Sequence, residues 1–168
     1  MNTAEKMFEC IEKLFEEARM KNILIKVSGD VKNHPDFLTF AVGQTKENYV
    51  VVITGSGTQV SKALETAGYM VQYNEHGRVT ATWEERKIAR DVLEKEAKAL
   101  EDKFLGKGIV VIPPILYAGS VLCHINADNL VKAYYLGFDE VYIFTLKERV
   151  EAKEKEFANY PKVKVVSV

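Results

Sequence analysis

The sequence has little cysteine and no excess of charge of either sign. Its two cysteines, Cys10 and Cys123, lie far apart and lack the paired spacing of metal ligands, which argues against a disulfide framework and a zinc site. The 23 basic and 24 acidic residues nearly cancel, so the chain lacks the positive charge typical of general nucleic-acid binders. We therefore expect neither a metal site nor a nucleic-acid partner.

Long uncharged runs are also scarce, with one exception at residues 108–127, GIVVIPPILYAGSVLCHINA. This run would match a membrane helix in length. Pro113 and Pro114 fall near its middle, so a strand, a turn and a second buried segment fit better than a membrane span. Residues 1–22 carry acidic side chains throughout and do not resemble a signal peptide, and we expect a cytoplasmic protein.

The hydrophobic pattern predicts strands that alternate with helices. Thr82 and Glu85 have the spacing of a capping box and open a long helix that runs to about Phe104. Pro35 suits the first turn of another helix. Strands are expected at 23–27, 48–54, 69–73, 108–112, 140–146 and 162–168, and helices at 3–20, 33–44, 58–68, 82–104, 125–137 and 147–160.

This alternation indicates an α/β fold with a mainly parallel open sheet. The expected strands are nearly continuous hydrophobic runs, as in sheets that helices cover on both faces. A chain of 168 residues, 47% of them hydrophobic, can form one such domain. We therefore predict a single domain over 1–168, a three-layer α/β/α sandwich preceded by an amphipathic helix at 3–20.

Two small loops follow the first two strands, and ligands of open α/β sheets bind at such strand ends. Gly29 lies in the first loop, and Gly55, Ser56 and Gly57 form the second, which leads directly into a helix whose free N–H groups favour anions. Lys26 lies two residues before the first loop and could stabilise negative charge there. Alternatively, the glycines merely allow tight turns, and Lys26 is solvated on an edge strand.

Further fragments, taken in order, give a resemblance to a known family. IKVSGD, ITGSG, GRVT, HINADN and EVYIFT together resemble the amino acid kinase family, with the acetylglutamate kinases most similar. The resemblance implies a carbamate kinase-like sandwich and phosphorylation of a substrate carboxylate with ATP and magnesium. It also implies a homodimer through the helix at 82–104, which the helix at 3–20 would extend to a higher homo-oligomer. Alternatively, the apolar side of the helix at 82–104 only covers the sheet.

The family's functional residues carry over to several positions. Lys26 matches the lysine that stabilises the transferring phosphoryl group, and Asp128 matches the aspartate that orients the catalytic lysines. Arg78 matches an arginine that grips a substrate carboxylate, and Asn126 matches a substrate-binding asparagine. Taken singly, Arg78 could be an ordinary loop arginine, Asn126 could fix a turn, and Asp128 could cap a helix. The glycines of the two loops match Gly29, Gly55 and Gly57.

The sequence also departs from the family pattern. The first loop, usually Gly-Gly-Ser in the family, is Ser28-Gly29-Asp30 here, and the charge of Asp30 would oppose a phosphate. Ser56 stands where a glycine is usual, although we keep Ser56 among the expected anion-binding residues. The nucleotide-binding half and its second catalytic lysine have no evident counterpart. Lys147 and Lys153 are instead expected on a solvated face.

These departures favour a reduced amino acid kinase-like domain that binds a small anionic ligand, with weak or no phosphotransferase activity. A second hypothesis is an active ATP-dependent kinase of the acetylglutamate kinase type, acting on a carboxylate, carbamate or phosphate acceptor. A third is a structural or partner-binding protein whose ancestral site is empty, in which case Lys26, Arg78 and Asp128 should not converge.

Overall fold

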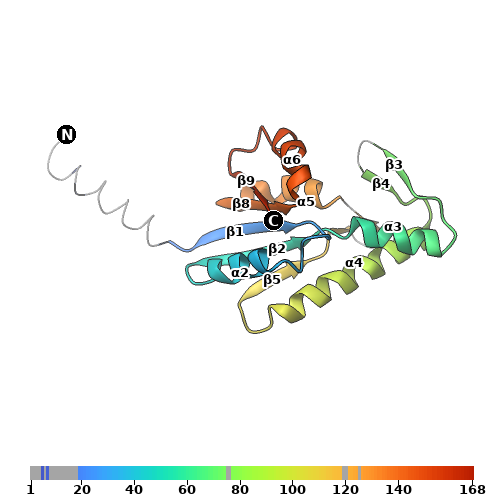
Figure 1. Cartoon of the computed structure of the whole chain (residues 1–168), viewed down its shortest axis with the longest axis horizontal. Helices are drawn as coiled ribbons and strands as arrows, with labels where there is room; N and C mark the ends of the chain where they lie inside the picture. The colour runs from blue at the N-terminus through green and yellow to red at the C-terminus, as the bar shows by residue number, and fades with distance from the viewer. Residues whose placement is uncertain (1–4, 6, 8–18, 75–76, 119–120, 125) are drawn as a thin grey trace.

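A five-stranded parallel sheet forms the centre of the computed structural model, which describes residues 5, 7, 19–74, 77–118, 121–124 and 126–168 (Figure 1). Each strand runs parallel to its neighbours. These are five of the apolar runs from which strands were predicted. From one edge to the other they are β5 (Ile109–Ile112), β2 (Asn48–Thr54), β1 (Lys21–Val27), β8 (Glu140–Thr145) and β9 (Val163–Ser167).

Strand β1 lies in the middle of the sheet, so its side chains are covered on both faces. Leu24 and Ile25, which point to opposite faces, are both fully buried. The alternative of an edge strand with a solvated lysine is therefore wrong. Val27 pairs with Thr54 of β2 on one side and with Phe144 of β8 on the other. Because the three strands end side by side, the loops that follow them meet at one edge of the sheet.

Helices cover both faces of the sheet, as the uninterrupted apolar strands predicted. On one face, α2 (Pro35–Gln44) and the end of α4 (Trp83–Lys103) pack against the strands. On the other face lie α5 (Ala127–Tyr134) and α6 (Val150–Glu156) (Figure 1). The 3₁₀ helix η1 (Tyr135–Gly137) directly follows α5, and η2 (Lys147–Arg149) directly precedes α6. The chain is thus an α/β fold with three layers.

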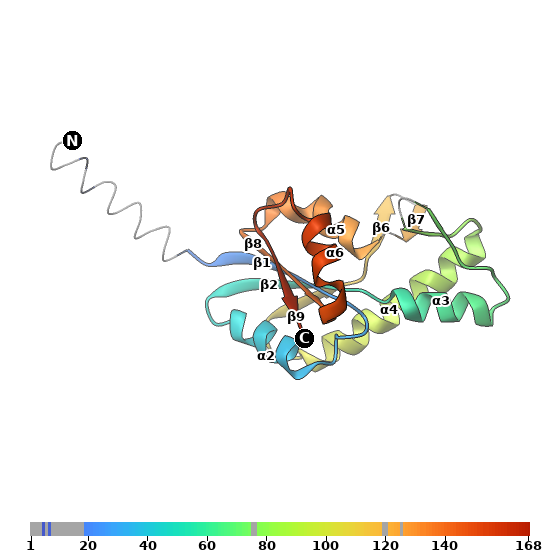
Figure 2. The ribbon, with the colours of Figure 1, turned by 45° about the horizontal axis from the view of Figure 1, so that its top comes forward.

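Helices α3 (Gly57–Thr66) and α4 extend past the carboxyl ends of the strands and pack on each other (Figure 2). The predicted capping box is confirmed, because the Thr82 hydroxyl accepts from Glu85 N and the Glu85 carboxylate accepts from Thr82 N. Ala89 and Leu93 of α4 are buried against Val60 of α3. Since the apolar side of α4 is already covered within the chain, the homodimer through this helix stays a prediction.

Two antiparallel hairpins complete the described chain. One joins β3 (Gln72–Asn74) to β4 (Gly77–Val79), so the short strand expected at 69–73 lies farther along. The other joins β6 (Ile115–Ala118) to β7 (Val121–His124), where the sequence predicted a buried segment after a turn. The strand at Ile109–Ile112 and the following turn are confirmed, but Leu116 is half exposed. No helix within the described ranges is long and apolar enough to span a membrane.

The amphipathic helix predicted at 3–20 lies almost entirely outside the described residues. Its structure and its role in assembly therefore stay predictions.

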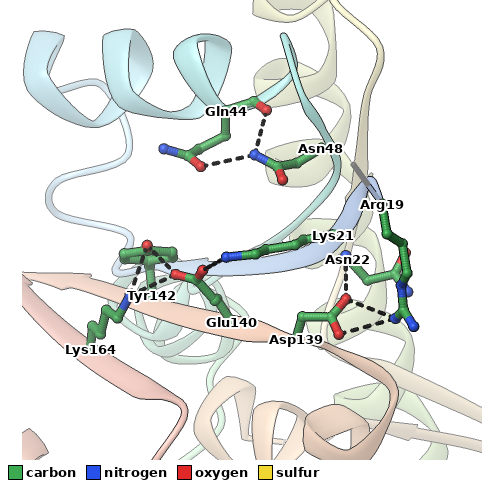
Figure 3. Close-up of polar contacts among 9 residues, drawn as sticks. All are labelled: Arg19, Lys21, Asn22, Gln44, Asn48, Asp139, Glu140, Tyr142 and Lys164. Carbon is green, nitrogen blue, oxygen red and sulfur yellow. Dashed lines mark hydrogen bonds and ion pairs between the residues drawn. The ribbon is translucent and has the colours of Figure 1, made fainter. Parts of the chain in front are cut away.

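A polar network ties the opposite, amino-terminal ends of three strands together (Figure 3). Glu140 of β8 lies 2.7 Å from Lys21 Nζ of β1 and 2.6 Å from Lys164 Nζ of β9, and it accepts a 2.6 Å hydrogen bond from the Tyr142 hydroxyl. These hydrogen bonds, that of Lys164 above all, lower the pKa of Glu140 to about 2. A pocket of about 530 Å³ opens beside this network, but the charged groups of the network are already paired with one another.

Glu140→Gln should destabilise the protein in a pH-dependent way. The folded-state pKa of Glu140 lies below its ordinary value, so its contribution is complete above about pH 5 and is lost as the pH falls towards about 2. At neutral pH the variant should lose about 1 kcal/mol or less of unfolding free energy, because solvent screens the network. Urea unfolding across this pH range tests this, with exposed Glu154→Gln as the control. Equal pH profiles for Glu140→Gln and the parent would contradict it.

Candidate functional site

A pocket of about 320 Å³ opens at the carboxyl ends of β1 and β2, where open α/β sheets bind ligands. The loops after these strands, the β3–β4 hairpin and the start of α5 line it. The structure brings together all eight residues that the sequence singled out. The pocket is lined by Lys26, Gly29, Gly55, Ser56, Gly57, Arg78, Asn126 and Asp128.

The two glycine loops touch each other directly. A Cβ atom on Gly29 would lie 2.5 Å from the carbonyl oxygen of Gly55, a distance that real Cβ atoms do not reach. A Cβ atom on Gly55 would in turn lie 3.2 Å from the carbonyl oxygen of Val27. Because β1 and β2 are adjacent and in register, the loops that follow them lie side by side, and at Gly29 only glycine permits so close an approach.

Lys26 lies on the floor of the pocket with only 4% of its surface exposed. Alternation along β1 places its side chain on the same face as Leu24, which is the face that α5 and α6 cover. Its Nζ lies 3.1 Å from Oδ1 of Asp128, at the start of α5, and donates a 3.2 Å hydrogen bond to the Ser28 hydroxyl. The lysine therefore reaches a carboxylate without leaving the interior.

A second lysine completes this buried cluster. Lys153 of α6 donates a 2.7 Å hydrogen bond to Oδ2 of Asp128 and another of 2.7 Å to Glu156. The expectation that Lys153 is solvated is therefore wrong, because its side chain is only 18% exposed. Lys147, from the same expectation, is exposed as predicted. One carboxylate thus holds two ammonium groups from two different elements.

Burial and charge oppose each other in this cluster. Burial lowers the pKa of Lys26, and the nearby Asp128 carboxylate only partly offsets this. Burial would raise the pKa of Asp128, but Lys26 and Lys153 together hold this pKa below its ordinary value. Burial would lower the pKa of Lys153, whereas Asp128 and then Glu156 raise it. The Asp128 carboxylate therefore stays ionised between the two lysines, while burial disfavours the charged form of Lys26.

Arg78 of β4 projects from the hairpin onto the start of α3. Its Nη2 donates to the carbonyl oxygen of Gly57 at 2.6 Å, the Ser61 hydroxyl at 2.8 Å and the Tyr73 hydroxyl at 2.9 Å. Its guanidinium also stacks over the Tyr73 ring, 5.2 Å from the ring centre. None of these partners is a carboxylate, so the positive charge of Arg78 remains available to an anion in the pocket.

Asn126 forms another wall of the pocket and acts as the N-cap of α5, so the capping role considered for Asp128 belongs to Asn126 instead. Its Oδ1 accepts a 2.8 Å hydrogen bond from the backbone N–H of Asp128. Its side chain also fits against Gly77 of the hairpin, whose φ is +109° and whose added Cβ would lie 3.3 Å from Nδ2. Asn126 therefore links the hairpin to the helix that carries Asp128.

Ser56 provides an unpaired polar group in the wall of the pocket. Its residue surface is 2% exposed, and within the described chain its hydroxyl has no hydrogen-bond partner. It precedes α3 but makes no capping bond to that helix. The first-turn N–H groups of α3 therefore lack a side-chain acceptor at this end, and a buried hydroxyl beside them lacks one as well. A ligand oxygen would satisfy both.

These residues fit a phosphoryl or carboxylate group better than a magnesium ion. The two carboxylates that line the pocket are both engaged, Asp30 with Arg149 and Asp128 with the two lysines. Each therefore already has a cationic partner, whereas magnesium sites use carboxylates that are not paired in this way. Across the described ranges, no three histidine, cysteine, aspartate or glutamate side chains gather closely enough to hold one. The ammonium group of Lys26 and the backbone N–H groups at the start of α3 supply the hydrogen-bond donors that an oxyanion requires.

The sequence-based prediction missed two charged residues of the site: Lys153, which contacts the pocket residue Asp128, and Arg149, which lines the pocket. Lys153 was taken for a surface residue because acids and bases dominate its helix. A usable signal was its spacing, four residues before the buried Phe157, which places both on the inward side of α6. Arg149, which lines the pocket beside Asp30, has no comparable signal, because its position depends on the pairing of β8 with β1.

Comparisons with known proteins support the fold alone. No family model and no curated protein matches the chain. The protein smu.665 from Streptococcus mutans UA159 superimposes with a TM-score of 0.61 at 16% identity, over 82% of this chain and 83% of that one. N-acetylglutamate synthase from Neisseria gonorrhoeae, solved with coenzyme A and L-arginine, gives 0.50 at 12% identity.

That second match covers 87% of this chain and 48% of the synthase, so the chain spans about half the length of that protein. At such low identities, both matches support an α/β fold and say nothing of activity. Neither protein is named as an amino acid kinase, and the family resemblance therefore stays a prediction.

Asp128→Asn should destabilise the protein by about 3 kcal/mol, because it leaves Lys26 buried without a charged partner. Adding Lys26→Met to this variant removes the unpaired charge and should restore part of that loss. Chemical denaturation of the single and double variants measures both effects. Asp91→Asn, which changes an exposed carboxylate on α4, should alter stability by less than about 0.5 kcal/mol. A single variant as stable as the parent would contradict the buried pairing.

Proposed function

We propose that this chain is a reduced amino acid kinase-like domain whose pocket binds a small anionic ligand. The observation that carries the proposal is the buried Lys26, held by Asp128 at the end of a central strand, directly below two glycine loops. A lysine so deeply buried is costly to keep. Lys26 and the uncapped start of α3 line the same pocket, and both attract anionic groups. A ligand that is an anion would therefore offset the cost of burying the lysine.

The remaining walls of the pocket have the same preference. Arg78 adds a guanidinium that no carboxylate neutralises, and Ser56 adds a buried hydroxyl without a partner within the described chain. A phosphate or carboxylate oxygen accepts hydrogen bonds from each of these groups. The order of these residues along the chain is that of the amino acid kinase motifs, which is the basis for proposing that family's fold.

Lys153 favours a second candidate function, an ATP-dependent phosphotransferase. The sequence offered no second lysine, yet Lys153 and Lys26 both reach Asp128. Two ammonium groups near one pocket could neutralise charge on a transferring phosphoryl group. Binding remains the primary proposal, because each carboxylate that lines the pocket already pairs with a cationic side chain.

Inorganic phosphate should raise the thermal midpoint of the protein in a concentration-dependent way, because it binds only the folded state. Lys26→Met should abolish most of this increase, and exposed Lys46→Met at the other end of the sheet should leave it unchanged. The midpoints of all three proteins are compared at constant ionic strength. Equal increases in all three would show that phosphate acts without using the pocket.

Two added ligands separate the remaining functions. Production of ADP from ATP with magnesium and N-acetylglutamate, lost in Lys153→Met, would establish the phosphotransferase. Stabilisation by phosphate without ADP production would support a binding domain. No stabilisation by phosphate, ATP or N-acetylglutamate would reject both functions in favour of a structural or partner-binding protein.

A further inference from the structure

Asp30 lies at the mouth of the pocket on a tight turn. The carbonyl oxygen of Ser28 accepts a 3.0 Å hydrogen bond from the backbone N–H of Val31, which closes a four-residue turn with Gly29 and Asp30 at its centre. The close contact of Gly29 with the second loop fixes this turn in place. The Asp30 carboxylate is therefore held at the pocket's edge, where it is about one-third exposed.

Arg149 faces Asp30 from a different part of the chain. It ends the 3₁₀ helix η2, in which its backbone N–H donates a 2.9 Å hydrogen bond to Leu146. This helix follows β8, and β8 pairs with β1, so the segments after the two strands lie side by side. Arg149 Nη1 lies 3.0 Å from Oδ2 of Asp30, and the guanidinium side chain is half exposed.

The charged side chains that line the pocket are Lys26 and Asp128 in the interior, Arg78 on the hairpin, and Asp30 with Arg149 at the mouth. In the interior, Lys26 shares Asp128 with Lys153. At the mouth, Arg149 pairs with Asp30, and both side chains line the same pocket. Asp30 is thus the carboxylate that an entering anion meets first. It is also the one whose removal would leave a guanidinium unpaired and accessible.

We propose that Asp30 acts as an internal anion that occupies Arg149 and weakens the pocket's affinity for anionic ligands. An entering anion must displace the Asp30 carboxylate from the guanidinium, and Arg149 then becomes a contact of the bound anion. The pair therefore sets the affinity of the site and favours ligands charged strongly enough to compete. This inference rests on the proposed anion-binding function of the pocket.

The experiment measures the dissociation constant for inorganic phosphate from thermal midpoints, each variant being referred to its own phosphate-free baseline. Asp30→Asn should bind phosphate about fivefold more tightly, and Arg149→Gln about fivefold more weakly, as expected for the loss of one partly exposed charge contact. In the double variant, the gain from Asp30→Asn should fall below about twofold, because the guanidinium that it frees is gone.

Matched controls separate this effect from a change in net charge. Glu148→Gln removes a negative charge, as Asp30→Asn does, and Lys147→Gln removes a positive charge, as Arg149→Gln does. Both control side chains are exposed on η2, the 3₁₀ helix that carries Arg149, and neither lines the pocket. Each should change the dissociation constant by less than about twofold, because exposed charges are screened. An equal gain from Asp30→Asn and Glu148→Gln would overturn the inference.

Failure of this inference can be told from failure of the proposed function. If phosphate binds the parent and requires Lys26, but Asp30→Asn shows no gain, the anion site stands and the role of Asp30 is wrong. If the gain persists in the Arg149→Gln background, Asp30 acts through space rather than by occupying Arg149, which also overturns the inference. If phosphate binds neither the parent nor Asp30→Asn, both proposals fall together.

Discussion

The ion pair between Lys26 and Asp128 is the interaction on which the pocket depends. It allows a charged lysine to remain in the central strand of a sheet that is otherwise apolar, and Lys153 shares the same carboxylate from the opposite side. Three elements are joined by this cluster: β1, α5 and α6. The charges of these side chains are paired only when all three elements pack together. The cluster therefore couples the packing of α5 and α6 on β1 to the shape of the pocket floor.

The main elements could be predicted because local signals were strong. The continuous apolar runs gave all five strands of the sheet, and Thr82 with Glu85 located the start of α4. The order of the strands is not a local property. That β1 lies between β2 and β8 follows from packing across the whole chain, and it decides that Lys26 is buried rather than solvated. The hairpin of β6 and β7 was not predicted, because a run of apolar residues does not distinguish a buried strand from a hairpin.

The same contrast between local signals and long-range packing applies to the residues of the site. Residues on the loops that follow strands, Gly29 and Gly55 among them, were found because a small residue after an apolar run marks a strand end. Arg149, which lines the pocket, and Lys153, which contacts Asp128, were not found, because they lie on a 3₁₀ helix and a helix whose charged composition is typical of a surface. The pairing of β8 with β1 brings them to the site, and no short motif encodes that pairing.

Mapping backbone amide chemical shifts during a titration with inorganic phosphate tests the location of the anion site most directly. We predict that the changes gather at residues 28–30, 55–58 and 126–128, around the pocket that contains Lys26. Changes gathered instead at residues 19–23, 44–48 and 140–142, around the pocket at the opposite ends of the strands, would contradict it.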